Sequence, residues 1–92
     1  MSNRIKEKDL EYLVEQINIV TNNPLEPYTK DKEGKFKSNP GNYHLGFAYG
    51  GVKLQQMANE GGGVRDHLYT GYTTKRKLYV ALNSFLTGLN HE

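Results

Sequence analysis

The segment from Thr73 to Lys77 combines two threonine hydroxyls with three consecutive basic residues. Apolar residues follow it at helical spacing, so a helix is predicted to begin at about Lys75. The first turn of a helix exposes unpaired N–H groups and carries a partial positive charge, so each exposed cation there costs roughly a few tenths to 1 kcal/mol. A bound anion reverses that cost, because N–H groups, hydroxyls and basic side chains all bind phosphate. The residues that we assign to a phosphate site are Thr73, Thr74, Lys75 and Arg76.

The competing interpretation of this segment is a solvated helix start. The three cations would then pair with Glu60, with Asp66 or with an acidic residue near the N-terminus. The two interpretations differ in whether a ligand or a carboxylate of the chain neutralises the cations.

A glycine run, Gly61-Gly62-Gly63, is the second candidate element, and Arg65 follows it closely. Glycine lets backbone N–H groups approach a ligand. No Gly-Lys-Ser/Thr follows at P-loop spacing, and the run does not match a dinucleotide fingerprint. We expect the run and Arg65 either to close over the bound phosphate or to form a plain hairpin turn, with Arg65 beside Asp66 on an exposed strand.

Tyrosines are the third candidate feature, since the chain has seven of them and no tryptophan. Tyr69 and Tyr72 flank Gly71 just before the basic segment. An aromatic ring beside cations can stack on a nucleobase. The alternative is ordinary packing of the connecting loop.

Catalytic and metal chemistry have weaker support in the sequence. The absence of cysteine excludes disulfides, thiol chemistry and cysteine-rich zinc sites. His44 and His67 fall on neighbouring predicted strands, but no further ligand stands at metal-binding spacing. Ser84 lies inside a predicted helix without a base placed beside it. We therefore expect a protein that is not an enzyme and that uses no metal or cofactor.

Two helices frame the predicted fold. The first runs from about residue 4 to 21 and the second from about 75 to 89, with Thr73 or Thr74 as the N-cap of the second. A thinner stripe of Ile5, Tyr12 and Ile19 on the first helix is either the edge of the core or a subunit contact. The main apolar faces consist of Leu10, Leu13, Val14, Ile17 and Val20 in the first helix, and of Leu78, Leu82, Phe85, Leu86 and Leu89 in the second.

Between the helices the pattern changes to strands. Residues 24–42 form a loop with a short hairpin of 28–30 and 35–37, which is expected to be mobile unless it rests on the body. Residues 43–49 alternate with period two, Gly50-Gly51 is predicted to turn the chain, and strands follow at 52–56 and 64–69. The residues expected to pack together in the core from the first of these strands are Tyr43, Leu45, Phe47 and Tyr49.

The sequence thus predicts one small α+β domain spanning residues 1–92. Its order is an N-terminal helix, a short hairpin or loop, a three-stranded antiparallel meander and a C-terminal amphipathic helix. A chain of 92 residues buries little surface, so a homo-oligomer is expected.

Charge and hydropathy narrow the function classes. The net charge is only +2, so a general coat for duplex DNA is disfavoured, whereas a focused anion site is not. No run approaches the ~20 apolar residues of a membrane span, and the first residues lack the apolar core of a secretory signal. We expect a protein of a reducing cytoplasm.

Several blocks of the sequence are similar to a known group. These blocks are Pro24–Thr29, Tyr43-His44-Leu45, Ala48–Leu54, Gly61–Gly63, Thr74–Tyr79 and Phe85–Leu89. Together they resemble small uncharacterised proteins of tailed bacteriophages and prophages, over roughly two thirds of the chain. Lys77 stands where that group has an acidic residue, so Lys75 and Arg76 are the preferred phosphate ligands. The resemblance implies no activity or fold, but it implies a phage gene that acts in the cytoplasm of an infected bacterium.

The leading hypothesis is a non-enzymatic, oligomeric phage protein that sequesters a phosphate-bearing, nucleotide-like ligand. By analogy of setting, this would counter a host defence signal. One alternative is an inhibitor that binds a host protein, and another is a binder of single-stranded nucleic acid. A structural part of the virion also remains open.

Overall fold

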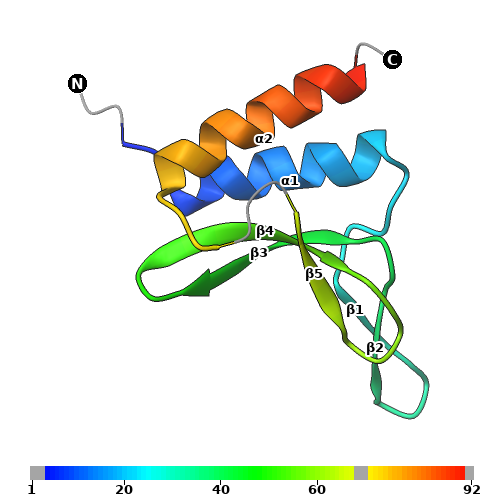
Figure 1. Ribbon diagram of the computed structural model, residues 1–92. Helices are drawn as coiled ribbons and strands as arrows, with labels where there is room; N and C mark the ends of the chain where they lie inside the picture. Colours follow the sequence, from blue (N-terminus) through cyan, green and yellow to red (C-terminus); the bar gives the residue numbers. More distant parts are fainter. Residues whose placement is uncertain (1–3, 68–70, 91–92) are drawn as a thin grey trace.

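Figure 1 shows the computed structural model of the chain, which describes residues 4–67 and 71–90. The predicted α+β order is confirmed, although the first helix starts later than expected and the predicted third strand reaches residues 68 and 69, which lie outside the described part. The elements are α1 (Glu7–Val20), β1 (Tyr28–Lys30), β2 (Phe36–Ser38), β3 (Tyr43–Ala48), β4 (Gly51–Met57), β5 (Val64–His67) and α2 (Lys75–Asn90).

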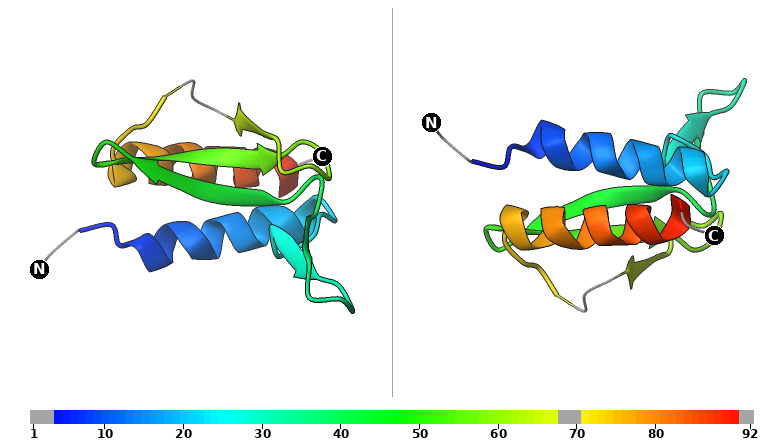
Figure 2. Two further views of the ribbon diagram at one scale, coloured as in Figure 1. Left: turned by 90° about the horizontal axis from the view of Figure 1, so that it is seen from below. Right: turned by 90° about the horizontal axis from the view of Figure 1, so that it is seen from above.

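The strands form two antiparallel sheets. One is the β1–β2 hairpin, and the other is a three-stranded meander in the order β3-β4-β5. Both helices lie on the same side of the meander and pack against each other, with α1 contacting β3 and α2 contacting β4 (Figures 1 and 2). In the described part of the chain, no helix is long and apolar enough to cross a membrane.

The core lies between the helix pair and the sheet. The predicted helical faces supply most of it, because residues three and four apart share one side of a helix. Val20 is the exception, since it is exposed at the end of α1. The buried residues of this cluster are Leu10, Leu13, Val14, Ile17, Tyr43, Val52, Leu54, Leu78 and Leu82.

The tyrosine-led stripe of β3 enters the core only at its beginning. Tyr43 is buried and Leu45 packs against the core, but Phe47 is half exposed and Tyr49 is 96% exposed. The β3–β4 hairpin reaches past the first turns of both helices, so its tip has no layer to cover it (Figures 1 and 2). The prediction that all four residues pack in the core was therefore wrong for Phe47 and Tyr49.

The turn of this hairpin is also one residue earlier than predicted. Tyr49 and Gly50 take the two positive φ angles, +54° and +74°, and Ala48 pairs with Gly51. This is the pattern of a two-residue primed turn. Gly51 is needed for another reason: a Cβ there would stand 2.9 Å from Tyr72 Cβ and 3.1 Å from Thr73 O.

The base of the segment 24–42 rests on the body of the protein. Ser38 Oγ donates a hydrogen bond to Asn59 O at 2.9 Å, and the Gly41 N–H donates to Met57 O at 2.8 Å. Within the segment, Asn42 Nδ2 donates to Pro24 O at 2.7 Å and Asn39 Nδ2 donates to Glu26 O at 2.9 Å. The hairpin was expected to be mobile only if it did not rest on the body, and its base does rest there. Its far end, Lys30 to Phe36, is exposed.

Candidate functional site at the start of α2

The start of α2 is fixed by a cap and by a strand-like pairing. Lys77 N–H donates to Thr74 Oγ1 at 3.2 Å, so Thr74, of the two predicted threonines, is the N-cap. Thr73 pairs with Val52 through two backbone hydrogen bonds of 2.9 Å each. The helix start is therefore attached to the first residues of β4, next to the β3–β4 turn.

A hollow of about 530 Å³ lies at this junction, and we call it the α2-start hollow. Its aromatic side consists of Tyr49 and Tyr72, whose rings meet edge to face with centroids 5.8 Å apart. Its polar side consists of the two threonines and Lys77. The complete lining is Tyr49, Gly50, Gly51, Tyr72, Thr73, Thr74 and Lys77.

Lys53, in β4, contacts the Tyr72 ring on the aromatic side of the α2-start hollow. Its Nζ lies 4.3 Å from the centroid of the Tyr72 ring and 2.9 Å from Asp66 Oδ1. The hydrogen bond between the two side chains lowers the pKa of Asp66 and raises the pKa of Lys53. The competing interpretation paired Asp66 with the basic run at the start of α2. In the structure, Asp66 is paired with Lys53 instead.

The three cations of the basic run do not line one common hollow. Lys77 shares the α2-start hollow with both tyrosines. Lys75 lines a separate hollow of about 370 Å³, together with Glu7 and Phe47. Arg76 is exposed and lines neither. Of these three cations, the structure therefore places Lys77, which is not one of the preferred phosphate ligands, in the same hollow as Tyr49 and Tyr72.

The glycine run does not join this site. Gly61 to Gly63 form the turn after Met57, whereas Thr73 pairs with Val52 near the opposite end of β4, roughly 16 Å of strand away. Asn59 Oδ1 accepts the N–H groups of Gly61 and Gly63 at 2.9 and 3.1 Å. The expectation that this loop closes over a phosphate at the helix start was therefore wrong. A plain hairpin turn, closed by Asn59, is what forms.

Arg65 is separated from the helix start for the same reason. It lies opposite Gln56 in the β4–β5 ladder, and its Nε donates to Gln56 Oε1 at 3.2 Å. Tyr69, the other predicted stacking residue, lies outside the described residues. Of the predicted site residues, Thr73, Thr74 and Tyr72 are brought together, with Lys75 close by along the helix.

Among the described residues, no group of three or more acidic or histidine side chains converges. His44 instead lies with its Nδ1 3.3 Å from Asn42 Oδ1. Burial lowers the pKa of His44 below its ordinary value.

Sequence reasoning missed three residues of this neighbourhood: Tyr49, Lys53 and the contribution of Lys77. Only the pairing of Val52 with Thr73 brings them together, and no local pattern encodes that pairing. Comparison with known proteins adds no relative: no family model, no curated protein and no solved structure matches the chain.

Proposed function

We propose that this is a non-enzymatic binding protein that holds a phosphate-bearing, nucleotide-like ligand in the α2-start hollow. One observation carries the proposal. The N-cap end of α2, the Lys77 ammonium and the rings of Tyr49 and Tyr72 line one hollow. Its volume, about 530 Å³, is within the range of small-molecule sites.

Each group has a distinct role in this arrangement. The phosphate lies at the amino end of α2, where the Lys75 N–H has no intrahelical acceptor and the helix dipole favours negative charge. Lys77 supplies an exposed countercharge, with Lys75 and Arg76 adding positive potential from the same turn. The base lies against Tyr72, whose ring is also in contact with the Lys53 ammonium. Because the cations are exposed, the affinity falls as salt rises.

A titration with defined probes tests the proposal. We expect ATP to bind in isothermal titration calorimetry at low salt, adenosine to bind much more weakly and inorganic phosphate to compete. Lys77→Ala should reduce the affinity for ATP several-fold, and Lys75→Ala with Arg76→Ala should reduce it further. Arg65→Ala removes one positive charge from β5, opposite the far end of β4, and is the matched control, so an equal loss there would contradict the assigned site.

Binding of single-stranded nucleic acid is the competing use of the same residues. It predicts an affinity for oligothymidylate that rises with length and falls steeply with salt. A hollow at one end of the hairpin fits a single nucleotide, so we expect little gain beyond two or three nucleotides. A strong gain with length would replace the nucleotide proposal.

The biological setting follows from the motif resemblance alone. In an infected bacterium, such a protein would lower the free concentration of a nucleotide signal. Native mass spectrometry of the protein purified from bacterial cells, before and after denaturation, would reveal a co-purified phosphate compound. The same spectra give the subunit number and thus test the expected homo-oligomer.

A further inference from the structure

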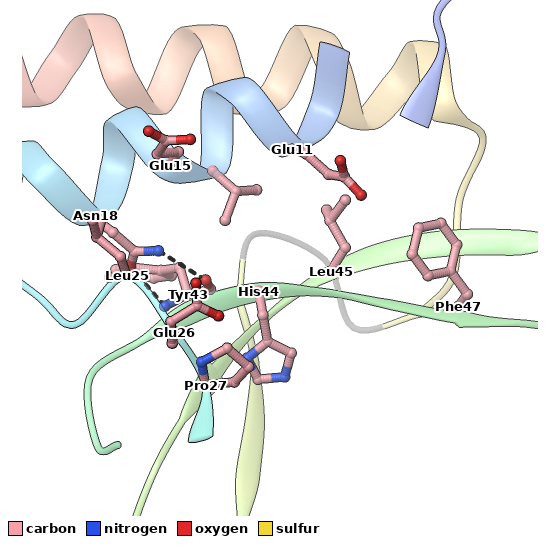
Figure 3. Close-up of a pocket in the computed structure, with 11 residues that line it drawn as sticks. Glu11, Glu15, Asn18, Leu25, Glu26, Pro27, Tyr43, His44, Leu45 and Phe47 are labelled. Atoms are coloured by element: carbon pink, nitrogen blue, oxygen red, sulfur yellow. Dashed lines mark hydrogen bonds between the residues drawn. The ribbon is translucent and has the colours of Figure 1, made fainter. Parts of the chain in front are cut away.

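A third hollow, of about 600 Å³, lies between α1 and β3, and we call it the acidic groove (Figure 3). Glu11 and Glu15 extend from α1, Leu45 points toward the helix from β3, and Glu26 comes from the loop after α1 (Figure 3). Among the described residues that line it, none is lysine or arginine. The lining consists of Glu11, Val14, Glu15, Asn18, Leu25, Glu26, Pro27, Tyr43, His44, Leu45 and Phe47.

The floor of the acidic groove includes the free edge of the sheet. β3 is one of the two outer strands of the order β3-β4-β5. Val52 directs both its backbone N–H and its carbonyl to Thr73, away from β3. Its partner Phe47 is therefore in a non-hydrogen-bonded pair, and the polar backbone groups of Phe47 point outward.

The other end of β3 shows the same orientation. Tyr43 N–H donates to Asn18 Oδ1 at 2.8 Å, and Asn18 Nδ2 donates to Tyr43 O at 3.0 Å, so the outward backbone groups of Tyr43 are satisfied by a side chain. Leu45 lies halfway between Tyr43 and Phe47 and shares their orientation, since strands repeat every two residues. Leu45 and Phe47 thus present the edge at which an added strand can bond.

The acidic side chains of α1 match the spacing of such a strand. Glu11 and Glu15 are four residues apart on one helical face, which is a rise of about 6 Å. Alternate residues of an extended chain advance by about 6.6–6.8 Å. In an added strand, the two residues that pair with Leu45 and Phe47 place their side chains on the helix side of the sheet. One of these side chains therefore faces Glu11 and the other faces Glu15.

We propose that the acidic groove binds an extended, basic segment of another protein, which adds to the edge of β3 as a further strand. Lysine or arginine at alternate positions lays its aliphatic stem on Leu45 and Phe47 and its charged end against Glu11 and Glu15. The intervening side chains face away from α1. This inference is independent of the nucleotide proposal, because the two sites share no lining residue.

A blocked nine-residue peptide with lysine at alternate positions and threonine or valine between them is the probe. We expect it to bind in fluorescence anisotropy, and a peptide with glutamate at the lysine positions not to bind. Glu11→Gln with Glu15→Gln should weaken binding about tenfold at low salt. The matched control, Glu33→Gln with Glu60→Gln, removes two exposed charges outside the groove and should leave the affinity unchanged.

Backbone methylation separates strand addition from charge attraction. Methylating the amide nitrogens that face β3 removes the donors but keeps every charge, so binding should fall at least tenfold, whereas methylating the nitrogens on the other edge should have little effect. Equal affinity of both methylated peptides would overturn the proposal. A dimer in native mass spectrometry that Glu11→Gln with Glu15→Gln dissolves, and that the peptide displaces, would also overturn it in favour of a second copy of this chain.

Discussion

The side-chain amide of Asn18 makes the two hydrogen bonds to Tyr43 that a neighbouring strand would otherwise make. Its Oδ1 accepts the Tyr43 N–H at 2.8 Å, and its Nδ2 donates to the Tyr43 carbonyl at 3.0 Å. Both residues are buried. The contact attaches the last turn of α1 to the first residue of β3. It thereby ends the open edge of the sheet at one side of the acidic groove.

Replacing Asn18 should destabilise the fold strongly. Asn18→Ala leaves a buried backbone N–H and carbonyl without partners, so we expect the free energy of unfolding to fall by about 2–4 kcal/mol in urea titrations. Gln16→Ala, a polar truncation two residues earlier in α1, should change it by less than about 0.5 kcal/mol. Similar effects of the two changes would mean that the Asn18–Tyr43 contact contributes little.

Tyr49→Asn should raise stability and lower ligand affinity at the same time. Tyr49 takes a φ of +54°, which is unfavourable for tyrosine, whereas Asn followed by Gly50 suits a primed turn. We expect a gain of about 0.5–1 kcal/mol in unfolding experiments. Because the ring lines the α2-start hollow, ATP affinity should fall, and Tyr49→Phe should retain most of it. A variant that is both less stable and equally able to bind would contradict the assigned turn and site.

Two glycines should respond in opposite ways to alanine. A Cβ at Gly51 would stand 2.9 Å from Tyr72 Cβ, so Gly51→Ala should lower the free energy of unfolding by about 1–3 kcal/mol. Gly88 lies inside α2 with nothing within 4 Å of a Cβ. Gly88→Ala should therefore raise it by about 0.5–1 kcal/mol. Thermal unfolding of both variants beside the parent protein tests whether the two changes in stability have opposite signs.

His44 should make stability depend on pH below neutrality. Burial lowers its pKa in the folded state below the ordinary 6.5, so the unfolded chain binds the proton more readily. The contribution of His44 is unperturbed above about pH 6.5 and becomes destabilising as the pH falls toward the folded pKa. The difference in unfolding free energy between the parent and His44→Gln should therefore change between pH 8 and pH 5, to the disadvantage of the parent. A constant difference would mean that His44 titrates alike in both states.

The sequence predicted those features of the fold that depend on interactions between residues close in the chain. The apolar faces of both helices, the Thr74 cap and the alternation of β3 depend on residues close in the chain. The turn was misplaced because positive φ angles favour glycine, which points to Gly50-Gly51, whereas Gly51 lies in β4 and Tyr49 takes the first turn position. The choice depends on Tyr72 and Thr73, which press against Gly51 from about twenty residues away in the chain.

The candidate site was predictable only in part for a related reason. Thr73 and Thr74 mark the helix start by themselves, but the neighbour of that start depends on the pairing of Val52 with Thr73. This pairing brings in Tyr49 and Lys53, and it leaves the glycine run at the other end of β4. The outward backbone groups of Leu45 and Phe47 were not predicted either, because their direction depends on the register of β3 against β4 and on the pairing of Val52 with Thr73.

Amide chemical shifts of the ¹⁵N-labelled protein during titration with ATP test the central proposal most directly. The nucleotide proposal predicts saturable shifts confined to Tyr49–Gly51 and to the segment from Tyr72 to Leu78, with none at Gly61–Gly63 or in the acidic groove. Absence of shifts at millimolar ATP and low salt, or shifts confined to the glycine run and Arg65, would contradict it.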